Sequence, residues 1–167
     1  MLARGELVRP RWIARVADSR GRTLVLPAPE VPREVWSPGV AAQLRELLVG
    51  VTTRGTAKSA FRDSRGRPLL GSVRVSGKTG SLSGVDPKGR YEWFIGVAPA
   101  ERPRIAIAAV VVNGALWWRN ASQIAAEVLR QVFCDGRRCQ PESLDRFRPA
   151  APPISRSPSS GPVGGGA

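Results

Sequence analysis

The sequence predicts an α+β fold in which an antiparallel sheet is packed by helices. Three extended segments follow one another between residues 72 and 114, and short turn-forming connectors separate them. Apolar residues recur at helical spacing in one segment before these strands and in one after them. We therefore expect a three-strand meander with an N-terminal hairpin before it and two main helices.

Residues 7–25 predict the hairpin, because two extended runs, LVRPRWIARVA and RTLVL, flank the turn formers Asp18-Ser19-Arg20-Gly21. Prolines at positions 27, 29, 32 and 38 keep the next segment irregular. Ser37-Pro38 then opens a helix over residues 38–52, since a capping serine followed by proline is a helix start signature. Periodic apolar residues make this helix amphipathic: Val40, Leu44, Leu47, Leu48 and Val51.

Residues 53–71 predict a polar loop with one helical turn around residues 56–61. The string DSRGR occurs twice, at residues 18–22 and 63–67, and the flanking sequences share nothing further. We interpret it as one turn used twice and not as an internal repeat.

Strands are expected at residues 72–84, 91–100 and 104–114, and the short connectors DPKGR and ERP pair them antiparallel. The third strand is apolar almost throughout, which predicts a place in the middle of the sheet with both faces covered. Asn120-Ala121-Ser122 precedes a helix of about 14 residues that packs on the sheet through periodic apolar residues. These are Ile124, Ala125, Val128, Leu129 and Val132.

The chain divides into a domain, residues 1–134, and a tail, residues 135–167. Beyond Pro141 the tail is rich in Pro, Ser, Gly and Arg and ends PSSGPVGGGA. A segment of this composition cannot bury enough apolar surface to offset the entropy of ordering, so we expect it to be disordered.

Composition narrows the functional classes. The formal charge is +13 and comes from 23 Arg and 3 Lys against 13 acidic residues. The arginines are spread along the chain, and aromatic residues do not interleave with them, which favours a solvated basic surface over a nucleic-acid partner. No His is present, so a Ser-His-Asp hydrolase or a His-zinc site cannot be built from this chain. We expect no metal and no cofactor.

Cys134 and Cys139 flank the turn formers Asp135-Gly136. They either form a disulfide, which suits an oxidising compartment such as a periplasm, or remain two free thiols. No stretch approaches the roughly 20 apolar residues that span a bilayer, and the first residues lack the apolar core of a secretion signal. The sequence as written therefore predicts no export signal of its own.

Ser76-Gly77-Lys78-Thr79-Gly80-Ser81 is the motif with chemical content. A phosphate-binding P-loop is excluded, because that loop needs a glycine five residues before Gly77, where this chain has Ser72, and a helix after the motif. An isolated Lys-Thr-Gly triplet is a weak signal by itself. Its surroundings decide the interpretation.

Four segments in order resemble the C-terminal part of the transpeptidase domain of penicillin-binding proteins, up to about Phe133. They are GELVRPRWIARVADSRGRTL, LRELLVGVTTRGTA with its Gly55-Thr56-Ala57, VSGKTGSLSG, and YEWFIGVAPAERPRIAIAAVVVNG. The resemblance implies a partial transpeptidase-like domain. It also implies serine acyl transfer on D-alanyl-D-alanine stem peptides in peptidoglycan cross-linking, with β-lactams as acylating inhibitors.

Two further motifs of this family, Ser-x-x-Lys and Ser-x-Asn, do not occur in the sequence. The family places both before the hairpin with which this chain begins, so their absence fits a start inside the domain and equally fits a degenerate copy. We expect this chain alone to be inactive.

The resemblance implies a role for each residue of the Lys-Thr-Gly strand. Lys78 supplies positive charge and hydrogen bonds to the Ser-x-Asn motif and the substrate carboxylate. Thr79 and Ser81 offer hydroxyl groups to the carboxylate of the peptide or β-lactam, and the backbone N–H of Ser81 is one oxyanion donor. Gly80 lets the ligand approach the strand, and Gly77 relieves crowding behind Lys78. Lys78 and Ser81 are thus the catalytic candidates and residues 78–81 the substrate-binding ones.

The family also implies the periplasmic face of the cell membrane, an upstream membrane anchor, and cell-wall synthesis proteins as partners. Two alternatives stay open: a β-lactamase or D,D-carboxypeptidase fragment, and a non-catalytic binding module derived from the fold.

We interpret Asp86 and Glu92 as surface charges. We interpret four aromatic residues as core or interface packing: Trp93, Phe94, Trp117 and Trp118.

Overall fold

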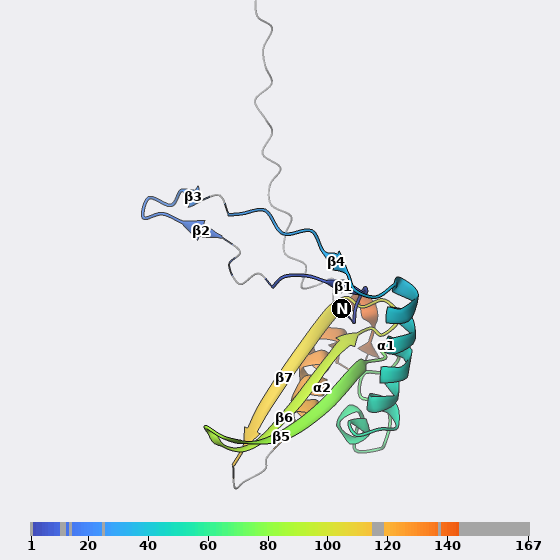
Figure 1. The fold of residues 1–167 in the computed structure, drawn as a ribbon. Coiled ribbons are helices and arrows are strands. Elements are labelled where there is room, and N and C mark those ends of the chain that lie inside the picture. The colour runs from blue at the N-terminus through green and yellow to red at the C-terminus, as the bar shows by residue number, and fades with distance from the viewer. Residues whose placement is uncertain are drawn as a thin grey trace, which may run out of the picture.

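A computed structural model describes residues 2–10, 13, 15–24, 26–114, 119–136 and 138–143. A three-stranded sheet forms its centre, with helix α1 (Pro38–Thr53) beside one edge and helix α2 (Ala121–Phe133) behind one face (Figure 1). The N-terminal arm, made of the described residues between 6 and 34, extends away from this body. The predicted α+β architecture is confirmed.

The sheet is the predicted meander. Strands β5 (Ser76–Val85), β6 (Lys88–Ala98) and β7 (Ile105–Asn113) pair antiparallel in the order β5-β6-β7. The first connector is shorter than DPKGR, because pairing continues up to Val85 and Lys88 and leaves only Asp86-Pro87 as the turn. Tyr91 stabilises this turn, since its hydroxyl oxygen lies 2.9 Å from the Asp86 carbonyl oxygen and 3.0 Å from that of Pro87.

The predicted place of the third strand is wrong for the part of the chain that the structure describes. β7 is an edge strand there, and β6 lies in the middle. Alternate β7 residues, including Ile107 and Ala109, face the core, whereas Val110 and Val112 are 49% and 40% exposed. A uniformly apolar strand does not reveal its neighbours, and the sequential order of a meander places the second strand in the centre.

Helix α1 confirms the predicted helix and its start signal: the Ser37 hydroxyl accepts a hydrogen bond from the Val40 N–H, and Pro38 opens the first turn. Its buried residues differ from the apolar set. Ala41 and Thr52 are buried, whereas Val40 and Leu47 are 50% and 74% exposed. The helix packs mainly on β5 and the short 3₁₀ helix η1 (Lys58–Phe61), so Val40 and Leu47 of its apolar stripe face outward in the described structure.

Helix α2 begins with a capping box, in which Asn120 and Gln123 each accept a hydrogen bond from the other's backbone N–H. It has 13 residues, close to the predicted length. Ala125 and Leu129 are fully buried against the sheet, as their periodicity predicts. Ile124 and Val128 are 38% and 44% exposed and therefore lie at the margin of the buried face.

Phe94 lies at the centre of the core and is fully buried. Its ring centroid is 5.5 Å from that of Phe61 in η1. The ring also covers Gly77 of β5, where a Cβ would collide with Phe94 and lie 2.9 Å from the carbonyl oxygen of Ile95. Glycine at this position thus lets the strand that carries Lys78 pack closely on the core.

The N-terminal arm contains the predicted hairpin in a short form. β2 (Val16–Ala17) pairs antiparallel with β3 (Thr23–Leu24). At the base of the arm, β1 (Glu6–Leu7) pairs antiparallel with β4 (Arg33–Glu34). The segment with four prolines is irregular, as predicted, except where β4 pairs.

The two DSRGR strings form the same turn, which confirms the prediction. In each, one Asp oxygen accepts hydrogen bonds from the backbone N–H groups two and four residues later, all at 2.9 Å. The other Asp oxygen accepts from the Arg Nε four residues later, and the Gly has φ near +79° or +75°. The backbone N–H of Arg22 lowers the pKa of Asp18 most, and that of Arg67 lowers the pKa of Asp63 most.

These turns predict a pH-dependent contribution to stability. A carboxyl group with a folded-state pKa below its unfolded value stabilises the fold above the unfolded pKa, and this is lost as pH falls through the folded pKa. We therefore expect Asp63→Asn to lower the free energy of unfolding more at pH 7 than at pH 2, measured by urea denaturation. Asp18→Asn is the control. Asp18 lies in the equivalent turn at the tip of the arm, which extends away from the body, so we expect a smaller effect on the free energy of unfolding at pH 7. Equal effects of Asp63→Asn at both pH values would contradict a role of the charge.

The C-terminal part settles the question of the cysteines. Cys134 and Cys139 form a disulfide across a hairpin of β8 (Cys134–Asp135) and β9 (Arg138–Cys139). Cys139 is partly buried and packs against the core. The remaining tail, residues 144–167, lies outside the described residues, as do Trp117 and Trp118.

Candidate active site

The strand β5 presents residues 78–81 beside a cavity of about 430 Å³. Alternation along the strand places Thr79 and Ser81 on the face that packs against α2, with Lys78 and Gly80 on the other face. The Lys78 side chain is exposed, and its Nζ donates a hydrogen bond of 2.5 Å to the carbonyl oxygen of Thr79. All four residues of the predicted site line the cavity, together with Thr56, Arg90, Glu92, Trp93, Asn120, Ala121 and Ser122.

A second segment reaches this cavity from the end of α1. The Thr56 hydroxyl lies 2.7 Å from that of Thr79, so the Gly55-Thr56-Ala57 turn and the Lys-Thr-Gly strand are joined by a direct hydrogen bond. Gly55 allows the turn, because a Cβ there would lie 3.0 Å from Val51 Cα and 3.1 Å from the Gly50 carbonyl oxygen. Each hydroxyl can donate to or accept from the other, which leaves both able to contact a ligand.

Charged residues of β6 lie at the other end of the cavity. Arg90 Nη2 donates to Ser81 Oγ at 3.1 Å, and Arg90 Nε lies 3.9 Å from Glu92 Oε1. Asn113 Nδ2 donates to Glu92 Oε2 at 3.4 Å. The side chain of Glu92 is only 15% exposed, so its interpretation as a surface charge is wrong.

Sequence reasoning missed Arg90 because it placed this residue in the connector between two strands. The two-residue turn at Asp86-Pro87 instead pairs Arg90 with Ser83 and Glu92 with Ser81. A hairpin register counted from that turn would have placed Arg90 beside the motif.

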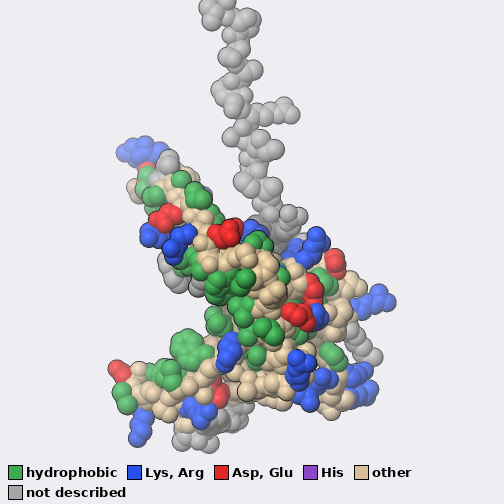
Figure 2. Space-filling model, turned by 45° about the vertical axis from the view of Figure 1, so that its right-hand side comes forward, with side chains coloured by type: hydrophobic (Ala, Val, Ile, Leu, Met, Phe, Trp, Pro, Cys, Tyr) green, Lys and Arg blue, Asp and Glu red, His purple; other side chains and the backbone are tan. Residues whose placement is uncertain are grey.

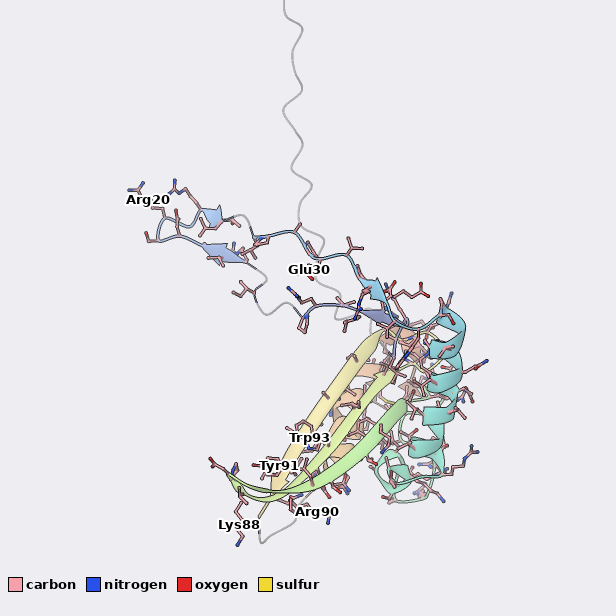
Figure 3. All side chains as sticks on the ribbon, in the orientation of Figure 1. Arg20, Glu30, Lys88, Arg90, Tyr91 and Trp93 are labelled. Atoms are coloured by element: carbon pink, nitrogen blue, oxygen red, sulfur yellow. A yellow bond between two sulfur atoms is a disulfide. The ribbon has the colours of Figure 1, made fainter. Side chains whose placement is uncertain are left out.

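The aromatic residues divide between core and cavity. Phe94 is in the core, as predicted. Trp93 is 43% exposed and lines the cavity next to Gly80, so in the described structure it does not lie in the core. Figure 3 shows Trp93, Tyr91 and Arg90 close together on the lower half of β6.

The cavity brings two cations, Lys78 and Arg90, and one carboxylate, Glu92, together with the hydroxyls of Thr56, Thr79 and Ser81. Such a set can bind an anion and offer hydrogen-bond donors to a polarised oxygen. In the described part of the chain no group of three or more His, Cys, Asp or Glu side chains is placed to hold a metal ion. Lys and Arg side chains are distributed over both arm and body on the face shown in Figure 2.

A meander edged by a Lys-Thr-Gly strand, with a terminal helix behind it and a cavity along the triplet, defines the class of transpeptidase-like domains. The chain belongs to the family of the penicillin binding protein transpeptidase domain, whose family model matches residues 1–133.

Two curated relatives are similar to this chain over part of its length. Peptidoglycan D,D-transpeptidase PbpA of Mycobacterium tuberculosis H37Rv is 37% identical over 86 residues, which are 50% of this chain and 16% of that protein. PbpA of Mycolicibacterium smegmatis is 30% identical over 113 residues, or 66% of this chain and 21% of that protein. The chain therefore spans about a fifth of the length of these relatives.

Solved structures share the fold. The D,D-transpeptidase domain of a peptidoglycan glycosyltransferase from Eggerthella lenta matches with a TM-score of 0.57 and 26% identity, covering 77% of this chain and 28% of that one. Penicillin-binding protein A of M. tuberculosis, solved as an imipenem acyl-enzyme complex, matches with a TM-score of 0.53 and 28% identity, covering 75% and 26%. No helix among the described residues is long and apolar enough to cross a membrane.

Proposed function

We propose that this chain forms the Lys-Thr-Gly side of the active site in a penicillin-binding D,D-transpeptidase that cross-links peptidoglycan. The observation that carries the proposal is the cavity along Lys78, Thr79, Gly80 and Ser81, which Thr56 also lines through its hydrogen bond with Thr79. Membership of the transpeptidase family supports it. The substrates are stem peptides ending in D-alanyl-D-alanine, and β-lactams are the acylating inhibitors.

Each residue of the strand has a proposed role. The Lys78 ammonium group provides a positive charge and three donors beside the reacting carbonyl and the ligand carboxylate. The hydroxyls of Thr79 and Ser81 bind that carboxylate, while the Ser81 backbone N–H is one of two donors to the oxyanion. Gly80 has no side chain to separate the ligand from the strand.

The nucleophile must come from outside this sequence. Acyl transfer requires a serine hydroxyl that attacks the carbonyl, a base that takes its proton, and a leaving amine that receives one. The chain contains no Ser-x-x-Lys and no Ser-x-Asn. We place the complete protein on the periplasmic side of the cell membrane, where a membrane anchor and other cell-wall synthesis proteins would accompany it. No cofactor enters the proposed reaction.

The test is a measurement on the natural gene product in cells. An antibody against residues 72–114 detects its size, and a fluorescent penicillin added before lysis detects acylation of the same band. We expect a labelled band far heavier than the 17.9 kDa of this chain. A heavy band that hydrolyses the label rapidly would favour a β-lactamase or carboxypeptidase. An unlabelled band at 17.9 kDa would contradict the proposal and leave a non-catalytic binding module.

A further inference from the structure

A polar network crosses all three strands at the level of Ser81. On the face that packs against α2, Ser81 of β5 accepts a hydrogen bond from Arg90 of β6 at 3.1 Å. Arg90 pairs with Glu92 of the same strand at 3.9 Å, and Glu92 accepts a hydrogen bond from Asn113 of β7 at 3.4 Å. Asn113 is buried at the end of β7, so the network runs from this buried residue across β6 to the cavity.

The direction of the first hydrogen bond determines what Ser81 can offer a ligand. A serine hydroxyl has one hydrogen and two acceptor sites. Arg90 can only donate, so it occupies an acceptor site of Ser81 Oγ and leaves the hydroxyl hydrogen for another group. A ligand atom that takes this hydrogen must be an acceptor, and the cation 3.1 Å behind the hydroxyl favours an anionic one.

We infer that Arg90 is a positioning residue that makes the Ser81 end of the cleft selective for carboxylates, with Glu92 and Asn113 holding Arg90 in place. The inference rests on the proposed function, because it assigns the selectivity to the same cleft. The burial supports this division of roles: the Glu92 side chain is 15% exposed, whereas that of Arg90 is 51% exposed and reaches the cavity. A network that served the sheet alone would not require a charged group directed at the motif.

The inference is tested by the ratio of two affinities in the full chain. Acetyl-D-alanyl-D-alanine and its C-terminal amide are titrated separately, and the backbone amide signals of Thr79 and Ser81 are followed by ¹H–¹⁵N NMR. The two peptides differ only at the C-terminus, where a neutral carboxamide replaces the carboxylate. We expect Arg90→Gln to weaken the acid about tenfold and the amide less than about twofold, because a charge-assisted hydrogen bond network is lost only for the acid. Arg90→Lys, which keeps the charge, should retain most of the preference.

Arg20→Gln is the matched control, since it removes the same charge at the tip of the arm, at the other end of the molecule from Arg90 (Figure 3). It should leave both affinities unchanged. Glu92→Gln should lower the acid preference about threefold by loosening Arg90. Acid and amide weakened equally by Arg90→Gln would overturn the inference and leave the proposed function standing.

Acetate serves as a third probe that separates the two claims. An Arg90-dependent shift of Ser81 with acetate but none with the dipeptide acid would support the carboxylate selectivity and contradict the peptide substrate. If neither acetate nor the dipeptide acid shifts the backbone amide signals of Thr79 and Ser81, both the inference and the proposed substrate are contradicted.

Discussion

Lys78→Ala is expected to abolish acylation of the natural gene product by a fluorescent penicillin, with a loss of at least about 100-fold in rate. Lys78 is the charged residue of the Lys-Thr-Gly triplet, and it lies at the cavity with its ammonium group against the Thr79 carbonyl oxygen. Its removal takes away both the positive charge and the donors that orient the ligand. The side chain is exposed, so the fold should not change.

The measurement is the initial rate of labelling, with circular dichroism and the melting temperature as checks on folding. Lys88→Ala is the matched control, because Lys88 lies in the same hairpin but next to its turn, away from the cavity (Figure 3). It should label at the normal rate. Normal labelling of Lys78→Ala would refute the assignment of this site, even if the protein is a transpeptidase.

Phe94→Ala is expected to lower the free energy of unfolding by about 3–5 kcal/mol, the usual range for deleting a buried phenylalanine ring. Phe94 is fully buried between η1 and β5, where it contacts Phe61 and covers Gly77. The cavity left behind adds to this cost, because a closely packed core relaxes only partially around it. The measurement is urea denaturation followed by tryptophan fluorescence.

The neighbouring Ile95→Ala is the control for this prediction. Ile95 faces the opposite side of the sheet and is 51% exposed, so its truncation should cost less than about 1 kcal/mol. A loss below about 1 kcal/mol for Phe94→Ala would show that this core is not the main source of stability in the chain.

Local signals predicted those features that depend on neighbouring residues. Ser37-Pro38 starts α1, Asn120 caps α2, and each of the two DSRGR strings forms the same kind of turn. Caps and turns are made by hydrogen bonds within a few residues, so their residue types suffice to recognise them. The short connectors likewise predicted the meander, because a strand that returns after a tight turn pairs with the strand before it.

The resemblance to a known family predicted more of the active site than the pattern of residues alone could. Lys-Thr-Gly by itself could have been an ordinary edge-strand sequence, and only the order of the four segments indicated a transpeptidase domain. The structure brings residues 78–81 together at one cavity, which is the placement that the proposed roles require. Those roles themselves remain predictions.

The sequence by itself determined the order and approximate limits of the strands and helices. Only the tertiary structure decided that β7 lies at the edge of the described sheet, that Val40 and Leu47 of α1 face outward, and that Arg90 reaches Ser81. It also joined Thr56 to Thr79 and Cys134 to Cys139. The physical reason is range: propensity and capping act over a few residues, whereas strand order, buried faces and contacts between side chains depend on how distant segments pack.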